Sequence, residues 1–241
     1  MHSVELSAEE RSALDALGTD LRRVFGARLQ TFAAYGLDAP ARGGSGPRTL
    51  HTVALVEHLT FADLTACAPL TAGWHRRNLA VPLLLESEEF LRTLDVFPLE
   101  YDEIIHDHRV LAGSDVFADL HVSPKDVRRA CELQAKSHLI HLREGYLETA
   151  GDPRAVSRLI AASADAFRAV LVNIARLSSV PAGDLAEVAE QHIGIPASVV
   201  REVFAAGTGA HGTIAEPTAL LARYLEASDR IWEYVDMWRE R

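Results

Sequence analysis

Two histidines flank an aspartate at His106-Asp107-His108, and this short run carries residue types that bind transition metals. In an extended segment, alternate side chains point the same way, so both imidazoles would share one side. With a carboxylate from Asp102 or Glu103, the group would offer the nitrogen and oxygen ligands of a zinc site. The alternative is an ordinary polar turn in which the same side chains have no metal to bind.

A second pair of histidines, His138 and His141, stands one helical turn apart, and Glu144 follows one turn later. This spacing places all three side chains on one helix face, which suits a metal. His-x-x-His by itself lacks the third and fourth partners of a zinc site, so we favour a solvated helix face. Cys67 and Cys131 stand far apart in apolar helical patterns, which predicts two buried thiols and no metal pair.

The composition is that of a folded globule: 48% of the 241 residues are hydrophobic and 24% are charged. Acidic residues outnumber basic ones by 34 to 24, and the formal charge of −10 repels phosphate backbones. We therefore expect no general nucleic-acid binding. No apolar run approaches the roughly 20 residues that span a bilayer, and the polar N-terminal segment does not read as a signal peptide. A cytoplasmic protein without a membrane partner is expected.

The elements that position these residues fall into two groups. In the first part of the chain, Ser7 and Glu10 form a predicted capping box at the start of an amphipathic helix. Beyond it, strands are expected at 31–35, 49–56, 79–85 and 96–104, helices at 60–76 and 87–94, and a Gly- and Pro-rich loop at 36–47. This alternation predicts a small α+β domain with a mixed sheet, which we place at residues 1–113.

The second part carries helix patterns only. Ser123-Pro124 is a strong helix start, because Ser caps a helix and Pro fits its first turn. Helices are expected at 123–149, 154–177, 182–192, 196–206 and 217–239. The sequence therefore predicts an all-α helical bundle over residues 114–241.

The last expected helix has an apolar stripe with steps of three and four residues. Its members are Leu221, Tyr224, Leu225, Ser228, Ile231, Trp232, Val235 and Trp238. We interpret the stripe as bundle core. The alternative is an interface for a homodimer or another partner.

One stretch of the sequence resembles a known family. Residues 94–104 read Leu-Asp-Val-Phe-Pro-Leu-Glu-Tyr-Asp-Glu-Ile, followed by His-Arg-Val-Leu-Ala-Gly at 108–113, Cys-Glu at 131–132 and Leu-Arg-Glu-Gly-Tyr-Leu at 142–147. In this order the segments resemble bacterial nucleotidyltransferase-like proteins of the polymerase-β type. The resemblance covers most of residues 30–240. It implies a nucleotidyltransferase domain followed by a helical domain similar to those of aminoglycoside-modifying members.

The resemblance also implies a catalytic motif, from which this sequence departs. In such enzymes a Gly-Ser pair after the first strand holds the triphosphate, and two carboxylates at alternating positions of the second strand hold Mg²⁺. Here Gly36 keeps the glycine and Leu37 replaces the serine. Thr49 and His51 stand at the carboxylate positions. Neither threonine nor neutral histidine replaces a hard oxygen ligand for Mg²⁺.

A third carboxylate, which the family has on a later strand, is assigned here to Glu100 or Asp102. On the expected strand 96–104 the two would share one face. Together with His106 and His108 they are the candidate metal ligands of the chain. Since the family pattern already includes His108, we favour the polar turn for that residue and expect no metal.

Three hypotheses follow. The leading one is a catalytically degenerate nucleotidyltransferase homologue that needs no cofactor and binds a small molecule or a protein partner. The second is an active enzyme with a rearranged site, in which Asp38, Glu100 and Asp102 hold Mg²⁺ and a nucleoside triphosphate. The third is a non-enzymatic interaction module that forms a homodimer through its C-terminal helices.

Overall fold

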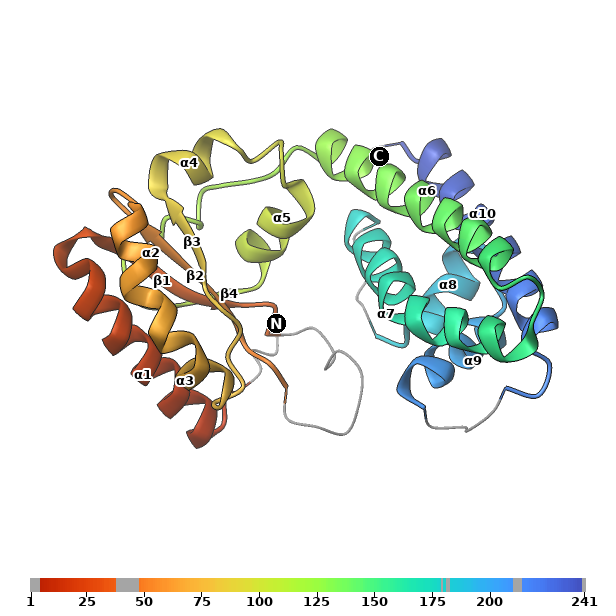
Figure 1. Ribbon diagram of the computed structural model, residues 1–241. Helices are drawn as coiled ribbons and strands as arrows, with labels where there is room; N and C mark the ends of the chain where they lie inside the picture. The colour runs from red at the N-terminus through yellow and green to blue at the C-terminus, as the bar shows by residue number, and fades with distance from the viewer. Residues whose placement is uncertain (1–4, 38–47, 179, 181–182, 210–213, 240–241) are drawn as a thin grey trace. The chain divides into compact units, whose positions relative to one another are not determined.

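The computed structural model describes residues 5–37, 48–178, 180, 183–209 and 214–239. The chain divides into two compact units between Ser123 and Pro124. This division lies later than the expected boundary after Gly113. The first unit contains a four-stranded mixed sheet and several helices, and within its described residues the second contains helices alone (Figure 1). The fold class is the expected α+β class, with a small mixed sheet followed by a helical bundle.

In the first unit the sheet has the strand order β3-β2-β1-β4. The elements are α1 (Ala8–Phe25), η1 (Gly26–Arg28), β1 (Leu29–Tyr35), β2 (His51–Val56), α2 (Phe61–Cys67), η2 (Ala68–Leu70), α3 (Thr71–His75), β3 (Leu83–Glu86), α4 (Ser87–Arg92), α5 (Pro98–His106) and β4 (His108–Gly113). β1 pairs antiparallel with both β2 and β4, whereas β2 pairs parallel with β3. The end of β1 therefore lies between the starts of β2 and β4.

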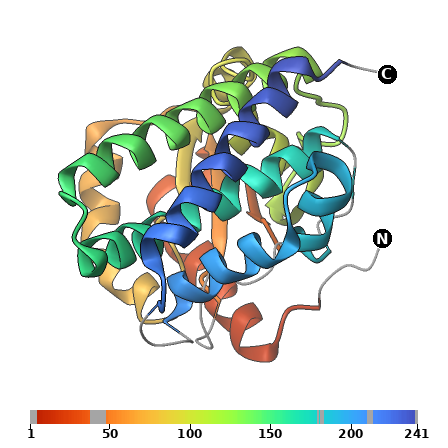
Figure 2. The same ribbon diagram turned by 90° about the vertical axis from the view of Figure 1, so that its right-hand side faces the viewer.

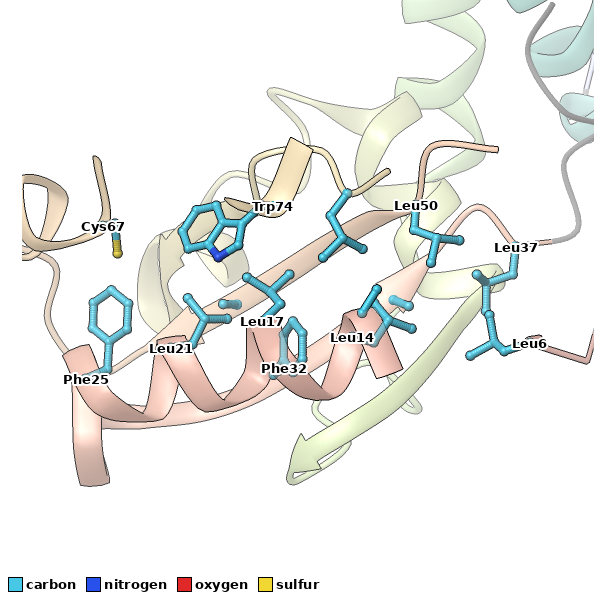
Figure 3. Packing of buried hydrophobic residues seen from close by; sticks show 14 of the residues in the cluster. Leu6, Leu14, Leu17, Leu21, Phe25, Phe32, Leu37, Leu50, Cys67 and Trp74 are labelled. Carbon is cyan, nitrogen blue, oxygen red and sulfur yellow. The ribbon is translucent and has the colours of Figure 1, made fainter. Parts of the chain in front are cut away.

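One face of the sheet packs against α1. Leu14, Leu17 and Leu21 recur at helical spacing and bury against Phe32 and Trp74 (Figure 3). The expected capping box forms, since the Ser7 hydroxyl accepts from the amide of Glu10 and the Glu10 carboxylate accepts from the amide of Ser7. Cys67 lies in the same core, and Cys131 is buried in the second unit, so both predicted buried thiols are confirmed.

The other face of the sheet carries α4 and α5 (Figure 1). Their core is aromatic: the ring of Phe90 lies 4.4 Å from that of Tyr101 and 5.4 Å from that of Phe117, centroid to centroid. Ile104 is fully buried beside them on α5. This packing fixes α5 over the sheet, and α5 carries the acidic residues considered below.

The expected strand at 96–104 is wrong, because residues 98–106 form helix α5. Phe97, Leu99 and Tyr101 alternate as in a strand, but Phe97, Tyr101 and Ile104 also fit a helical stripe. Pro98 decides between the two patterns: its fixed φ suits the first helical turn, and it has no N–H for a sheet. The fourth strand is instead the short β4.

Two other elements are shorter than expected. The helix expected at 60–76 is interrupted by η2, where Pro69 follows α2. The strand expected at 79–85 shrinks to β3, because Pro82 cannot donate to a strand ladder. Only an isolated bridge from Leu50 to Leu79 marks its expected start.

The second unit is built from α6 (Pro124–Glu148), α7 (Pro153–Leu177), α8 (Leu185–Ile193), α9 (Ala197–Thr208) and α10 (Pro217–Met237). Figure 2 faces this unit and shows α6 and α10 side by side. The stripe of α10 is bundle core, as expected, because Leu221, Tyr224, Ile231 and Val235 are buried. Across the described parts of the chain, no helix combines the length and apolarity needed to cross a bilayer.

One residue of β2 invites a stabilising substitution. The Thr52 hydroxyl is buried, and among the described residues its oxygen has no hydrogen-bond partner. Replacing Thr52 with valine removes this desolvated polar atom without changing the side-chain shape, so we expect a gain of about 1 kcal/mol in unfolding free energy. Thr31→Val is the matched control: the Thr31 hydroxyl donates to the Ser114 carbonyl at 2.8 Å, and its loss should destabilise the protein. Urea unfolding of the two variants measures both effects.

Candidate functional site

The turn after β1 is the position where the resemblance places triphosphate binding. Gly36 has φ of +65°, and its amide donates to the Asp107 carbonyl oxygen at 3.0 Å. A Cβ atom added to Gly36 would lie 3.1 Å from an oxygen of the Glu103 side chain. At this turn, therefore, the Gly36 amide is bonded to backbone, and a carboxylate stands beside it. The sequence pattern had no signal for the role of Glu103, because α5 was expected to be a strand.

Leu37, at the serine position, belongs to the hydrophobic core. Its side chain is buried and lies beside Leu6 (Figure 3). Arg48 fixes the same turn: its Nη1 donates to the Leu37 carbonyl oxygen at 2.7 Å, and its Nε donates to Glu10 at 3.1 Å. The turn is thus tied to the first turn of α1 by apolar packing and by an ion pair.

Three aromatic or imidazole side chains lie in register across the sheet at this end. Tyr35 pairs with His51 on one side and with His108 on the other. The Tyr35 and His51 rings are tilted, with centroids 5.9 Å apart. His51 is half-buried, and Thr49, just before β2, is exposed. Strands are spaced about 4.8 Å apart, so the backbones of His51 and His108, two strands apart, are separated by roughly 10 Å.

His108 connects α5 to the segment after β4. Its Nδ1 lies 3.1 Å from the Ile105 carbonyl oxygen, and its Nε2 lies 3.2 Å from Oδ1 of Asp115. Burial alone raises the pKa of the Asp115 carboxyl, but hydrogen bonds from the Phe117 amide and from His108 outweigh it and hold that pKa below its ordinary value. Both ring nitrogens of His108 face oxygens of the protein, so this side chain has a structural role: it links α5 to the segment after β4.

The acidic candidates of α5 do not converge. Glu100 and Asp102 would share a face on a strand, but two residues on a helix are about 200° apart. Glu100 is exposed. Asp102 instead lies 3.1 Å from Nδ1 of His106, one turn later on the same helix. No three metal-ligating side chains come together anywhere in the described part of the chain. Asp38, the remaining acidic candidate, lies outside the described residues.

The strand that runs parallel to β2 supplies no carboxylate at this end of the sheet. Residues 79–85 are all apolar, and the first acidic side chain is Glu86. Glu86 pairs with Val56 at the opposite end of β2 and accepts from the Leu59 amide at 2.9 Å. At the position of Thr49 and His51, the sheet therefore presents hydroxyl, imidazole and phenol groups instead of acidic ligands.

The expectation of a solvated face for His138 is wrong. Its side chain is buried in the helical unit, with Nε2 2.8 Å from the Tyr224 hydroxyl and the ring stacked on Phe167. Burial, with a smaller contribution from His141, lowers the pKa of His138 to about 4. Burial also raises the pKa of the Tyr224 hydroxyl. His141 and Glu144 are exposed, so these residues form no common metal site.

Comparisons with known proteins support the fold. No protein-family model matches the sequence, and no curated protein matches it either. Among solved structures, the chain is similar to a spectinomycin adenyltransferase, AAD(9) from Enterococcus faecialis, crystallised with ATP and spectinomycin. The similarity covers 92% of this chain and 98% of the other, with a TM-score of 0.52 and 12% sequence identity. This chain therefore has a nucleotidyltransferase-like fold.

Proposed function

We propose that this protein is a catalytically degenerate member of the nucleotidyltransferase fold that acts by binding a small molecule or a protein partner. The observation that carries the proposal is the structure of the Gly36-Leu37 turn. Its glycine amide is bonded to Asp107, its second residue is core, and a carboxylate lies against it.

Electrostatics supports the proposal. A triphosphate requires free amide donors and positive charge around it. The carboxylate of Glu103 near Gly36 would repel the phosphates. Among the described residues, Arg48 lies at this turn, and its guanidinium is already bonded to Glu10 and to the Leu37 carbonyl oxygen. Opening the turn would also move Leu37 out of the core.

The ligand set for Mg²⁺ supports it as well. Mg²⁺ prefers carboxylate oxygens in octahedral geometry, and in nucleotide-transfer sites it is held by one or two carboxylates and the substrate phosphates. Thr49 and His51 offer a hydroxyl and an imidazole, and the parallel neighbour of β2 offers only apolar side chains at this level. The rearranged active site is less well supported, because Glu100 and Asp102 point to opposite sides of α5.

A nucleotide-transfer assay tests the proposal. We expect neither Mg²⁺-dependent transfer from ATP nor saturable binding of Mg²⁺-ATP by calorimetry, with a working adenyltransferase as the positive control. Magnesium-dependent transfer that disappears in His51→Ala would overturn the proposal. The binding role is tested by a thermal-shift screen: a ligand of this end of the sheet should stabilise the unmodified protein and fail to stabilise His51→Ala.

A further inference from the structure

Three large aliphatic side chains of α6 lie in line on the surface of the helical unit. Leu133 is 72% exposed, Ile140 41% and Leu147 76%. Steps of seven residues correspond to two helical turns, so the three share one side of the helix, which we call the α6 line. The opposite side of α6 packs on α7 and α10 (Figure 2). Single exposed leucines are common, but an aligned set on one helix is a mark of an interface.

Charges of opposite sign flank the α6 line. Arg129, Lys136 and Arg143 repeat at seven-residue steps along one side, Glu148 stands on the other, and Glu144 lies next to the seam itself. Arg129 and both glutamates are exposed and make no ion pair with any residue that the structure describes. The contact of Arg143 with Asp229 is long, at 3.5 Å, and exposed. Lys136 instead lies over the Trp232 ring of α10, with Nζ 3.5 Å from the ring centroid. The exposed seam is therefore flanked by Arg129 and Arg143 on one side and by Glu148 on the other.

We propose that the α6 line is the interface of a homodimer in which the two α6 helices run parallel. In a parallel pair each of the three side chains meets its own copy, and the basic flank faces the acidic flank of the partner, so Arg143 lies opposite Glu148 of the second copy. In an antiparallel pair centred on Ile140, basic flank would face basic flank, and Arg143 would have no acidic residue of the second copy opposite it. Charge complementarity thus favours a second copy of this chain as the partner and a parallel arrangement of the two α6 helices.

The same geometry sets the strength of the dimer. Three apolar layers make a small interface, and interfaces of this size are weak and transient. Glu144 lies next to the seam, so its two copies approach each other and oppose association. We therefore expect a monomer–dimer equilibrium that shifts with protein concentration.

Sedimentation velocity over a concentration series tests the surface. The sedimentation coefficient of the unmodified protein should rise with concentration towards that of a dimer, and Ile140→Glu should remain monomeric. The double variant Leu133→Gln, Leu147→Gln changes the two more exposed positions, so it keeps the fold and should also be monomeric. Met237→Gln, an exposed apolar residue away from the line, is the matched control and should dimerise normally. A monomer at every concentration, or a dimer that survives both sets of changes, would overturn the proposal.

A charge swap tests the direction. Arg143→Glu and Glu148→Arg should each weaken the parallel dimer by about tenfold, which equals about 1.4 kcal/mol, and the double swap should restore it. In an antiparallel dimer Glu148 of the partner would not face position 143, so the double swap would fail to restore association, which contradicts the proposal. These outcomes are independent of nucleotide binding, because α6 belongs to the helical unit and the Gly36 turn to the other.

Discussion

Gly113→Ala is expected to lower the unfolding free energy by about 3 kcal/mol or more. Gly113 ends β4 with φ of +83°, a conformation that L-residues rarely adopt. A Cβ atom there would overlap the carbonyl oxygen of Gln30 and lie 2.7 Å from its carbonyl carbon. Because that neighbour is backbone, the clash is relieved only if β4 moves away from β1, where Thr31 pairs with Gly113. Urea unfolding followed by circular dichroism measures the loss.

Gly36→Ala is the matched control for this prediction. Gly36 lies in the same unit and also has a positive φ, but its neighbour is the end of the flexible Glu103 side chain. The strain of the left-handed conformation alone costs roughly 1 to 2 kcal/mol, so Gly36→Ala should be clearly less damaging. Equal losses in the two variants would show that the backbone contact at Gly113 has no special effect.

Much of the fold was predictable because its signals are local. The capping box at Ser7 and the helix start at Ser123-Pro124 depend on residues within one turn of each other, and the structure confirms both helices. The helices of the second unit were predicted from apolar periodicity and from the Gly and Pro residues at which they begin or end.

Helix α5 was mispredicted because the apolar residues of this segment fit both the two-residue period of a strand and the 3.6-residue period of a helix. Phe97, Leu99 and Tyr101 match a strand, and Phe97, Tyr101 and Ile104 match a helix. The error carried over to the candidate site, since Glu100 and Asp102 lie on one face of a strand but on opposite sides of a helix. The contact between Glu103 and Gly36 could not be predicted, because it joins residues distant in sequence through the packing of α5 on the sheet.

The burial of His138, by contrast, could have been predicted from its position in the helical spacing, but we expected a solvated face because histidine is polar. Cys131, Ala135, His138 and Leu142 follow helical steps of four, three and four residues, and all four are buried. The periodicity thus placed His138 on the inner face of α6. A histidine on such a face is buried in neutral form, with its nitrogen bonded to a core hydroxyl, here that of Tyr224.

This burial makes the stability of the helical unit depend on pH. The folded-state pKa of His138 is about 4, against an ordinary value of 6.5. As the pH falls below 6.5, the unfolded chain takes up a proton at this histidine, while the folded chain does so only near pH 4. The neutral His138 side chain therefore does not reduce the unfolding free energy above pH 6.5. As the pH falls from 6.5 to 4, protonation of this histidine in the unfolded chain progressively lowers the unfolding free energy. The difference in pKa corresponds to roughly 3 kcal/mol.

His138→Gln isolates this contribution, because glutamine can bond the Tyr224 hydroxyl and does not titrate. Urea unfolding free energies measured from pH 7.5 to pH 4 should fall less steeply in His138→Gln than in the unmodified protein, and the gap between the two slopes should integrate to roughly 3 kcal/mol. His141→Gln is the control: it removes the exposed neighbour on the same helix and should leave most of the slope in place. Carboxyl groups titrate alike in all three chains, so their effect cancels in the comparison. Parallel curves for the unmodified protein and His138→Gln would mean that His138 takes up its proton in the folded state as readily as in the unfolded chain.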